Sequence, residues 1–194
     1  TLILIDGHAL AFRQYFALER TNMKTSDGTP TWAVYGFFKA VFDLLKNENL
    51  KADAIAVAFD VSHKTFRTEK YEDYKCNREA MPDSMRTQME LIYEGLRAFN
   101  IPIYTKEGFE ADDVIGTISR EACELGHKVL ILTGDQDAFQ LVDKEAVYPG
   151  LFVNGFHAYA LFERGKHLLR TFPIRNKAIG LLCLLWRGST PLKA

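Results

Sequence analysis

The 194-residue sequence predicts an α/β fold in which a mainly parallel sheet is covered by helices on both faces. Two observations lead to this prediction. Four short apolar runs have the length and composition of buried strands, and the segments between them have the apolar spacing of amphipathic helices. Strands that alternate with helices of this length typically form parallel sheets through crossover connections. The length suits one domain with a single sizeable core.

The predicted elements can be assigned in chain order. A run at 2–5 predicts the first strand, and residues 8–18 and 32–45 predict two helices on either side of a turn cluster at 25–30. A second strand is expected at 54–59, followed later by a helix at 84–99 and a strand at 101–104. The last pair is a helix that opens at Glu110 and runs to about Leu125, and a strand at 129–132.

Carboxylates follow all four predicted strands. They are Asp6, Asp60, the group Glu110, Asp112 and Asp113, and the pair Asp135 and Asp137. Ligands of open parallel sheets bind beyond the carboxyl ends of the strands, so we expect these acids to meet at one edge. Unpaired, they would repel one another, and divalent cations are the simplest neutralising partner. An all-oxygen set suits Mg²⁺ or Mn²⁺, and since no His or Cys stands at these positions, zinc is not expected.

Two other interpretations of these acids remain open. Any single acid after a strand is usually a helix cap or a turn residue, although four consecutive loops are harder to explain in this way. Aspartyl-phosphate phosphatases and response regulators also carry acids at their strand ends. These proteins usually need a lysine after a later strand, and no suitable lysine stands near the fourth strand end.

Residues 62–82 interleave basic and aromatic side chains, among them Arg67, Tyr74, Lys75 and Arg78. Such a mixture suits phosphate neutralisation and base stacking. Acids in the same segment nearly cancel the positive charge, so a solvated helix with internal ion pairs is an equal alternative. The position of the segment, directly after Asp60, favours nucleic-acid binding.

The charge distribution changes near residue 145. Residues 1–145 hold 17 of the 24 Lys+Arg but 24 of the 25 Asp+Glu, which leaves 146–194 basic with Glu163 as its one acid. We see no secretory signal, and the longest apolar run, 178–186, is far shorter than the roughly 20 residues of a membrane span. Three widely spaced cysteines indicate a reducing compartment, so we expect a cytoplasmic protein without membrane contact. The sequence gives no indication of oligomeric state.

Five motifs, ILIDG, VAFD, TFR…YEDYKCNR, GFEADDVIG and ILTGDQD, resemble in order and spacing the 5′→3′ exonuclease domain of bacterial DNA polymerase I. That domain belongs to the flap-endonuclease family, which is related to PIN-like nucleases. The resemblance covers about residues 1–145. It implies a 5′ nuclease fold with a helical arch at about 62–82 and hydrolysis of DNA phosphodiester bonds with two divalent ions.

The resemblance also implies roles for individual residues. Asp6, Asp60, Glu110, Asp112 and Asp113 would hold the first ion, and Asp135 and Asp137 would contribute to the second. Lys75 and Arg78 resemble the catalytic basic pair of the arch, with Arg67 and Tyr74 as further DNA contacts. The implied substrates are 5′ flaps and nicked duplex ends, including RNA primers, which are processed during replication and repair.

The chain departs from the family after residue 145. Neither the G-D-x-S-D-N-I-P-G segment, with its two further aspartates, nor the helix-hairpin-helix that grips duplex DNA is found in 146–194. A frameshifted or truncated gene is one hypothesis for this divergent basic tail. The sequence therefore predicts a 5′ nuclease, with a catalytically impaired DNA-binding remnant as the alternative.

Overall fold

The computed structural model describes residues 1–48, 50, 52–61, 80–135, 138 and 141, and the backbone of 157–161. Within these ranges the strands form one sheet in the order β3-β2-β1-β4-β5. The strands are β1 (Leu2–Asp6), β2 (Ala54–Ala58), β3 (Ile103–Tyr104), β4 (Val129–Thr133) and β5 (His157–Leu161). The pairs among β1 to β4 are parallel, and β5 pairs antiparallel with β4. The predicted mainly parallel sheet is confirmed.

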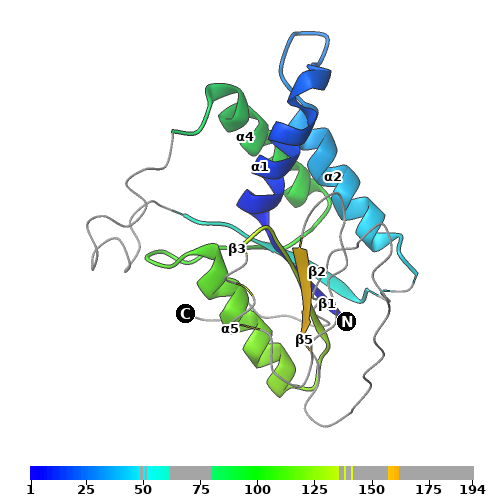
Figure 1. The fold of residues 1–194 in the computed structure, drawn as a ribbon, viewed down its shortest axis with the longest axis vertical. Helices are drawn as coiled ribbons and strands as arrows, with labels where there is room; N and C mark the ends of the chain where they lie inside the picture. Colours follow the sequence, from blue (N-terminus) through cyan, green and yellow to red (C-terminus); the bar gives the residue numbers. More distant parts are fainter. Residues whose placement is uncertain are drawn as a thin grey trace.

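Helices cover both faces of this sheet, as the sequence predicted. They are α1 (Gly7–Leu18), α2 (Trp32–Leu45), α4 (Asp83–Ala98) and α5 (Ala111–Glu124), with a short 3₁₀ helix, η1 (Glu19–Thr21), after α1. Figure 1 shows α1, α2 and α4 together on one side of the sheet and α5 on the other. The α/β layering is therefore helix, sheet, helix.

The central strand β1 is buried along its whole length. It lies between β2 and β4, with Leu4 opposite both Ala56 and Ile131. Because helices cover both faces, its side chains are buried whichever way they point, which explains the continuous apolar run in the sequence. This strand leads directly to Asp6.

Gly7 lies where the start of α1 meets the end of β2. It is the first residue of α1, and a Cβ atom built on it would lie 2.3 Å from the ring of Phe59. Phe59 is fully buried directly after β2. The glycine therefore lets the start of α1 approach the end of β2, which brings the two strand ends together.

Two strands differ from the sequence-based prediction. The strand expected at 101–104 is shortened to β3 because Pro102 has no N–H to donate, although its carbonyl oxygen accepts from Val57 N at 3.0 Å. Strand β5 was not predicted. It lies in the segment assigned to the basic tail, of which the other residues are outside the described ranges.

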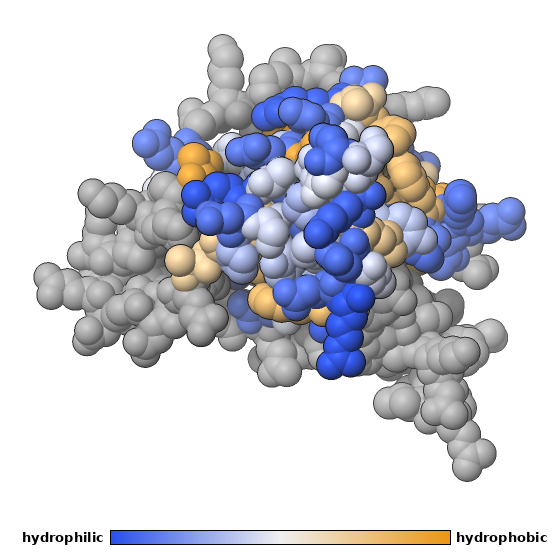
Figure 2. All heavy atoms as spheres, turned by 90° about the horizontal axis from the view of Figure 1, so that it is seen from above, coloured by the Kyte–Doolittle hydropathy of each residue, from blue (hydrophilic) through white to orange (hydrophobic). Residues whose placement is uncertain are grey.

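The outer surface over α1, α2 and α4 is mostly hydrophilic, with hydrophobic groups between the polar ones (Figure 2). Large exposed apolar side chains on these helices include Phe16, Tyr35 and Leu45. No helix in the described part of the chain has the length and apolar character needed to cross a membrane.

Candidate acidic active site

Asp6 lies at the junction of β1 and α1 and is only 8 % exposed. One carboxylate oxygen accepts from the backbone N–H of Ala9 at 3.0 Å, which makes Asp6 the N-cap of α1. The other accepts from the hydroxyl of Thr133 at 3.0 Å. Both oxygens are thus held in fixed positions at the carboxyl end of the central strand.

Thr133 is a part of this edge that the sequence did not reveal. It is the last residue of β4 and is fully buried. Its hydroxyl donates to Asp6 and accepts from the backbone N–H of Asp135 at 3.1 Å. One side chain therefore joins the ends of β1 and β4. A hydroxyl at the end of an apolar run, just before Gly134 and Asp135, was the available signal.

Asp60 connects the end of β2 to the start of α5. Its Oδ1 atom accepts from the backbone N–H of Ala111 at 2.5 Å, and its own backbone N–H donates to His8 Nδ1 at 3.3 Å. His8 Nδ1 also lies 3.8 Å from Asp60 Oδ2. His8, which is not one of the acidic positions of the sequence pattern, therefore lies beside Asp60.

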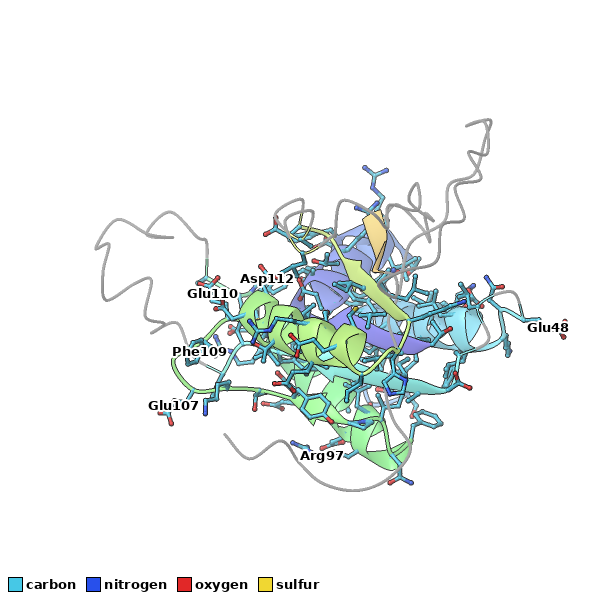
Figure 3. All side chains as sticks on the ribbon, turned by 90° about the horizontal axis from the view of Figure 1, so that it is seen from below. Glu48, Arg97, Glu107, Phe109, Glu110 and Asp112 are labelled. Atoms are coloured by element: carbon cyan, nitrogen blue, oxygen red, sulfur yellow. The ribbon has the colours of Figure 1, made fainter. Side chains whose placement is uncertain are left out.

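The acids at the start of α5 have two different environments. Glu110 and Asp113 form a capping box, in which Glu110 N donates to the Asp113 side chain at 3.0 Å and Asp113 N donates to the Glu110 side chain. This agrees with the interpretation of these acids as helix caps. Asp112 lies between them in sequence but not in the box. Figure 3 shows Glu110 and Asp112 at the first turn of α5.

Burial and nearby negative charge disfavour ionisation of two of these carboxyls. Burial raises the pKa of Asp112 to about 7, and the charges of Asp6, Asp135, Asp60 and Glu110 add to this effect. Asp112 therefore interacts electrostatically with an acid from each of the four strand ends. Acids from all four strand ends therefore share one edge of the sheet.

Asp6 is affected in the same way. Burial raises its pKa to about 6, against the opposing effect of the hydrogen bonds from Ala9 and Thr133, and the charges of Asp60 and Asp135 raise it further. An edge with such acids is poised to take up a positive ion or protons near neutral pH.

The positions of these side chains do not by themselves form a coordination site. Within residues 1–135 as far as they are described, no three acidic, histidine or cysteine side chains are arranged to hold a metal ion. Asp137 lies outside the described residues, as do the four arch candidates Arg67, Tyr74, Lys75 and Arg78. Their predicted roles, and the arch itself, stay predictions.

Comparison with known proteins identifies relatives of this chain. It is 49% identical over 142 residues to DNA polymerase I of Chloroflexus aurantiacus, covering 73% of this chain and 15% of that protein. DNA polymerase I of Mycobacterium tuberculosis is 46% identical over 151 residues, covering 77% of this chain and 16% of that protein. The chain thus spans about a sixth of the length of these curated relatives.

Solved structures of phage T5 proteins have a similar fold. A T5 protein co-crystallised with metal ions has a TM-score of 0.59 and 22% identity, covering 81% of this chain and 57% of that one. A T5 flap endonuclease crystallised with DNA and metal ions has a TM-score of 0.55, also at 22% identity, with the same two coverages. At this identity the likeness establishes the fold.

The family model described as "5′-3′ exonuclease, N-terminal resolvase-like domain" matches residues 1–160. This match includes all four parallel strands and their acidic ends, together with most of β5. The chain belongs to the family of 5′-3′ exonuclease N-terminal domains found in bacterial DNA polymerase I.

Proposed function

We propose that this chain is a divalent-metal-dependent 5′ nuclease that hydrolyses phosphodiester bonds of DNA at 5′ flaps and nicked duplex ends. The observation that carries this proposal is the convergence of Asp6, Asp60, Glu110, Asp112 and Asp135 on one sheet edge. Burying like charges together is costly unless a cation or protons neutralise them. Membership of a 5′-3′ exonuclease family supports DNA as the substrate.

The donor set fits a hard divalent cation such as Mg²⁺ or Mn²⁺, because the acids supply oxygen ligands. We assign Asp6, Asp60, Glu110, Asp112 and Asp113 to a first ion, and Asp135 with Asp137 to a second. Bound there, a divalent cation would lower the pKa of a water molecule and stabilise charge on the reacting phosphate. The T5 structures of similar fold were crystallised with metal ions, which supports a metal ion in this fold but does not identify its ligands.

The side chains around these acids have positioning roles in this scheme. Thr133 fixes the orientation of Asp6, and the backbone of Ala111 fixes Asp60. We assign Lys75 and Arg78 to contacts with the scissile phosphate, and Arg67 and Tyr74 to the rest of the DNA strand. In the full-length relatives, such a domain would remove RNA primers and displaced 5′ strands during replication and repair.

A catalytically impaired DNA-binding remnant is the second candidate. The capping box favours it, because Glu110 and Asp113 already bind each other's backbone and are partly used in stabilising α5. This candidate predicts binding of branched DNA without turnover.

Cleavage of a 5′-labelled flap DNA in Mg²⁺, in Mn²⁺ and in EDTA separates the two candidates. We expect short 5′ products that require metal and disappear in Asp112→Asn, a variant that also excludes contaminating nuclease. A folded protein that gives no product in either metal but shifts flap DNA in a gel would contradict the nuclease and support the remnant.

A further inference from the structure

A pocket of about 500 Å³ lies beside the acidic edge, between the end of β2, the C-terminal half of α4 and β3. Its volume is in the range of small-ligand pockets, roughly 300–1,000 Å³. Asp60 stands in its wall, so the pocket opens next to one of the converging acids. The polar interactions described above for the acidic edge do not involve its other lining residues.

The lining combines an aromatic ring with a cation. Tyr93 and Arg97 are one helical turn apart on α4 and both line the pocket. The Tyr93 ring packs on Phe59, with centroids 4.5 Å apart, so its position is fixed by the core. The Arg97 guanidinium carbon lies 6.0 Å from the Tyr93 centroid, at the outer limit of a cation–π contact. This loose contact leaves the guanidinium available to another partner.

The rest of the lining is apolar with one hydroxyl. Val61, Ile101 and Ile103 contribute aliphatic surface, and Thr105 contributes a hydroxyl. Val61 is 53 % exposed although it is aliphatic. Figure 3 shows Arg97 reaching into solvent near the end of α4. The pocket thus offers a flat ring and aliphatic walls for a planar apolar group, and an exposed guanidinium for an anion.

From this lining we propose that the pocket binds one unpaired nucleotide of the DNA strand, with its base against Tyr93 and its phosphate at Arg97. Bases stack on aromatic side chains whatever their sequence, and guanidinium binds phosphate oxygens in a forked geometry. Since Asp60 is in the wall, the bound nucleotide lies next to the phosphate that is cut. The inference rests on the proposed function and adds a subsite that recognises an unpaired nucleotide.

The phenol of Tyr93 stays uncharged under assay conditions. Burial raises the pKa of Tyr93 to about 12, with a further contribution from the charge of Asp60. A neutral ring does not repel the phosphate of the nucleotide. Binding should therefore depend on the ring itself and not on its hydroxyl.

The test is titration of the full chain with a single-stranded trinucleotide that carries 2-aminopurine in the middle, in EDTA so that no cleavage occurs. We expect saturable quenching of 2-aminopurine by the wild-type protein. Tyr93→Leu should reduce the quenching by at least half, whereas Tyr93→Phe should retain it. Arg97→Ala should weaken binding about five- to tenfold, and Arg97→Lys should lose less.

Arg120→Ala is the matched charge control, because Arg120 is an exposed residue of α5 outside the pocket. It should leave the trinucleotide affinity within a factor of two. Thermal melts of each variant exclude unfolding as the cause, since Tyr93 also packs on Phe59. Absence of saturable quenching by the wild type, or equal affinity of Tyr93→Leu, Arg97→Ala and the control, would overturn the pocket assignment.

The result of the trinucleotide titration can be distinguished from the result of the flap-cleavage assay. Quenching that needs Tyr93 and Arg97 in a protein that cleaves nothing would support the pocket and refute the nuclease. Metal-dependent cleavage by the wild type, with a trinucleotide affinity that does not change on substitution of Tyr93 or Arg97, would support the nuclease and refute the pocket.

Discussion

At the scale of single residues, the Thr133 hydroxyl holds two parts of the acidic edge together. It donates to Asp6 and accepts from the backbone of Asp135, and it is fully buried. A hydrogen bond to a charged partner contributes more than a neutral one, and a buried group left without its partner carries a desolvation cost. Thr133 therefore stabilises both the fold and the ionised form of Asp6.

Replacing Thr133 with valine keeps its shape and removes the hydroxyl. We expect Thr133→Val to lower the free energy of unfolding by about 2 kcal/mol at pH 7.5 in EDTA. The loss should shrink at pH 5, because Asp6 has a pKa of about 6 and is then mostly protonated. Urea denaturation at the two pH values measures this difference.

Thr87→Val provides the matched control for this experiment. The Thr87 hydroxyl is exposed and donates to Asp83 O within α4, at 3.4 Å. Its loss should change stability by less than about 0.5 kcal/mol at either pH. An effect of Thr133→Val that is the same at both pH values would show that the hydroxyl does not act through the Asp6 carboxylate.

At the scale of elements, the first turn of α5 carries both candidate metal ligands and helix caps. Asp113 is the clearest case, because its carboxylate accepts from Glu110 N at 3.0 Å in the capping box. Its capping role is thus visible, whereas its assignment as a metal ligand is a prediction from family resemblance.

Substitution of Asp113 separates these two roles. Asp113→Asn keeps an oxygen that accepts from Glu110 N and should cost less than about 0.5 kcal/mol of stability in EDTA, whereas Asp113→Ala should cost about 1 kcal/mol. If Asp113 is also a ligand, Asp113→Asn should weaken Mn²⁺ binding in calorimetry at least tenfold. Unchanged Mn²⁺ affinity would remove Asp113 from the ligand set and leave it as a cap.

The helices and strands also show which parts of the fold could be predicted from the sequence. Strands β1, β2 and β4 and all four helices were predicted, because their apolar periods are continuous and local. Strand β3 is shorter than predicted because Pro102 has no backbone N–H to donate. Strand β5 was not predicted because it pairs with β4, and this pairing cannot be read from the sequence of the segment itself. Thr133 was missed for a related reason, since its partner Asp6 lies 127 residues away along the chain.

At the scale of the whole molecule, the acidic edge makes stability depend on pH. The pKa values of Asp6 and Asp112 are raised to about 6 and about 7 in the folded protein, from 3.8 for each group in the unfolded chain. The folded state therefore holds more protons between pH 4 and 7 than the unfolded state. By linkage, the free energy of unfolding falls as pH rises through this window.

In EDTA, we expect the protein to lose on the order of 3 kcal/mol of stability between pH 4.5 and 7.5 from these two carboxyls. Asp112→Asn should flatten this slope and be more stable than the wild type at pH 7.5. Glu124→Gln, an exposed acid at the far end of α5, should leave the slope unchanged. Urea denaturation across the pH range provides the measurement.

Addition of Mn²⁺ at pH 7.5 extends the same experiment. A cation that binds only the folded state raises its stability by mass action. We expect Mn²⁺ to restore the stability of the wild type and to have little effect on Asp112→Asn. A wild-type protein whose stability is flat with pH in EDTA would contradict the raised pKa values and weaken the case for a buried acidic edge.

The strand order determines at which stage of synthesis the acidic edge can form. Strand β1 precedes its neighbour β4 by more than 120 residues along the chain. Pairing across such a separation is slow, because the loop must close before the contact is gained. Asp6 receives its Thr133 partner only at that late step. The nascent chain can therefore complete this part of its acidic edge only when β4 joins the sheet, after β1, β2 and β3 have been made.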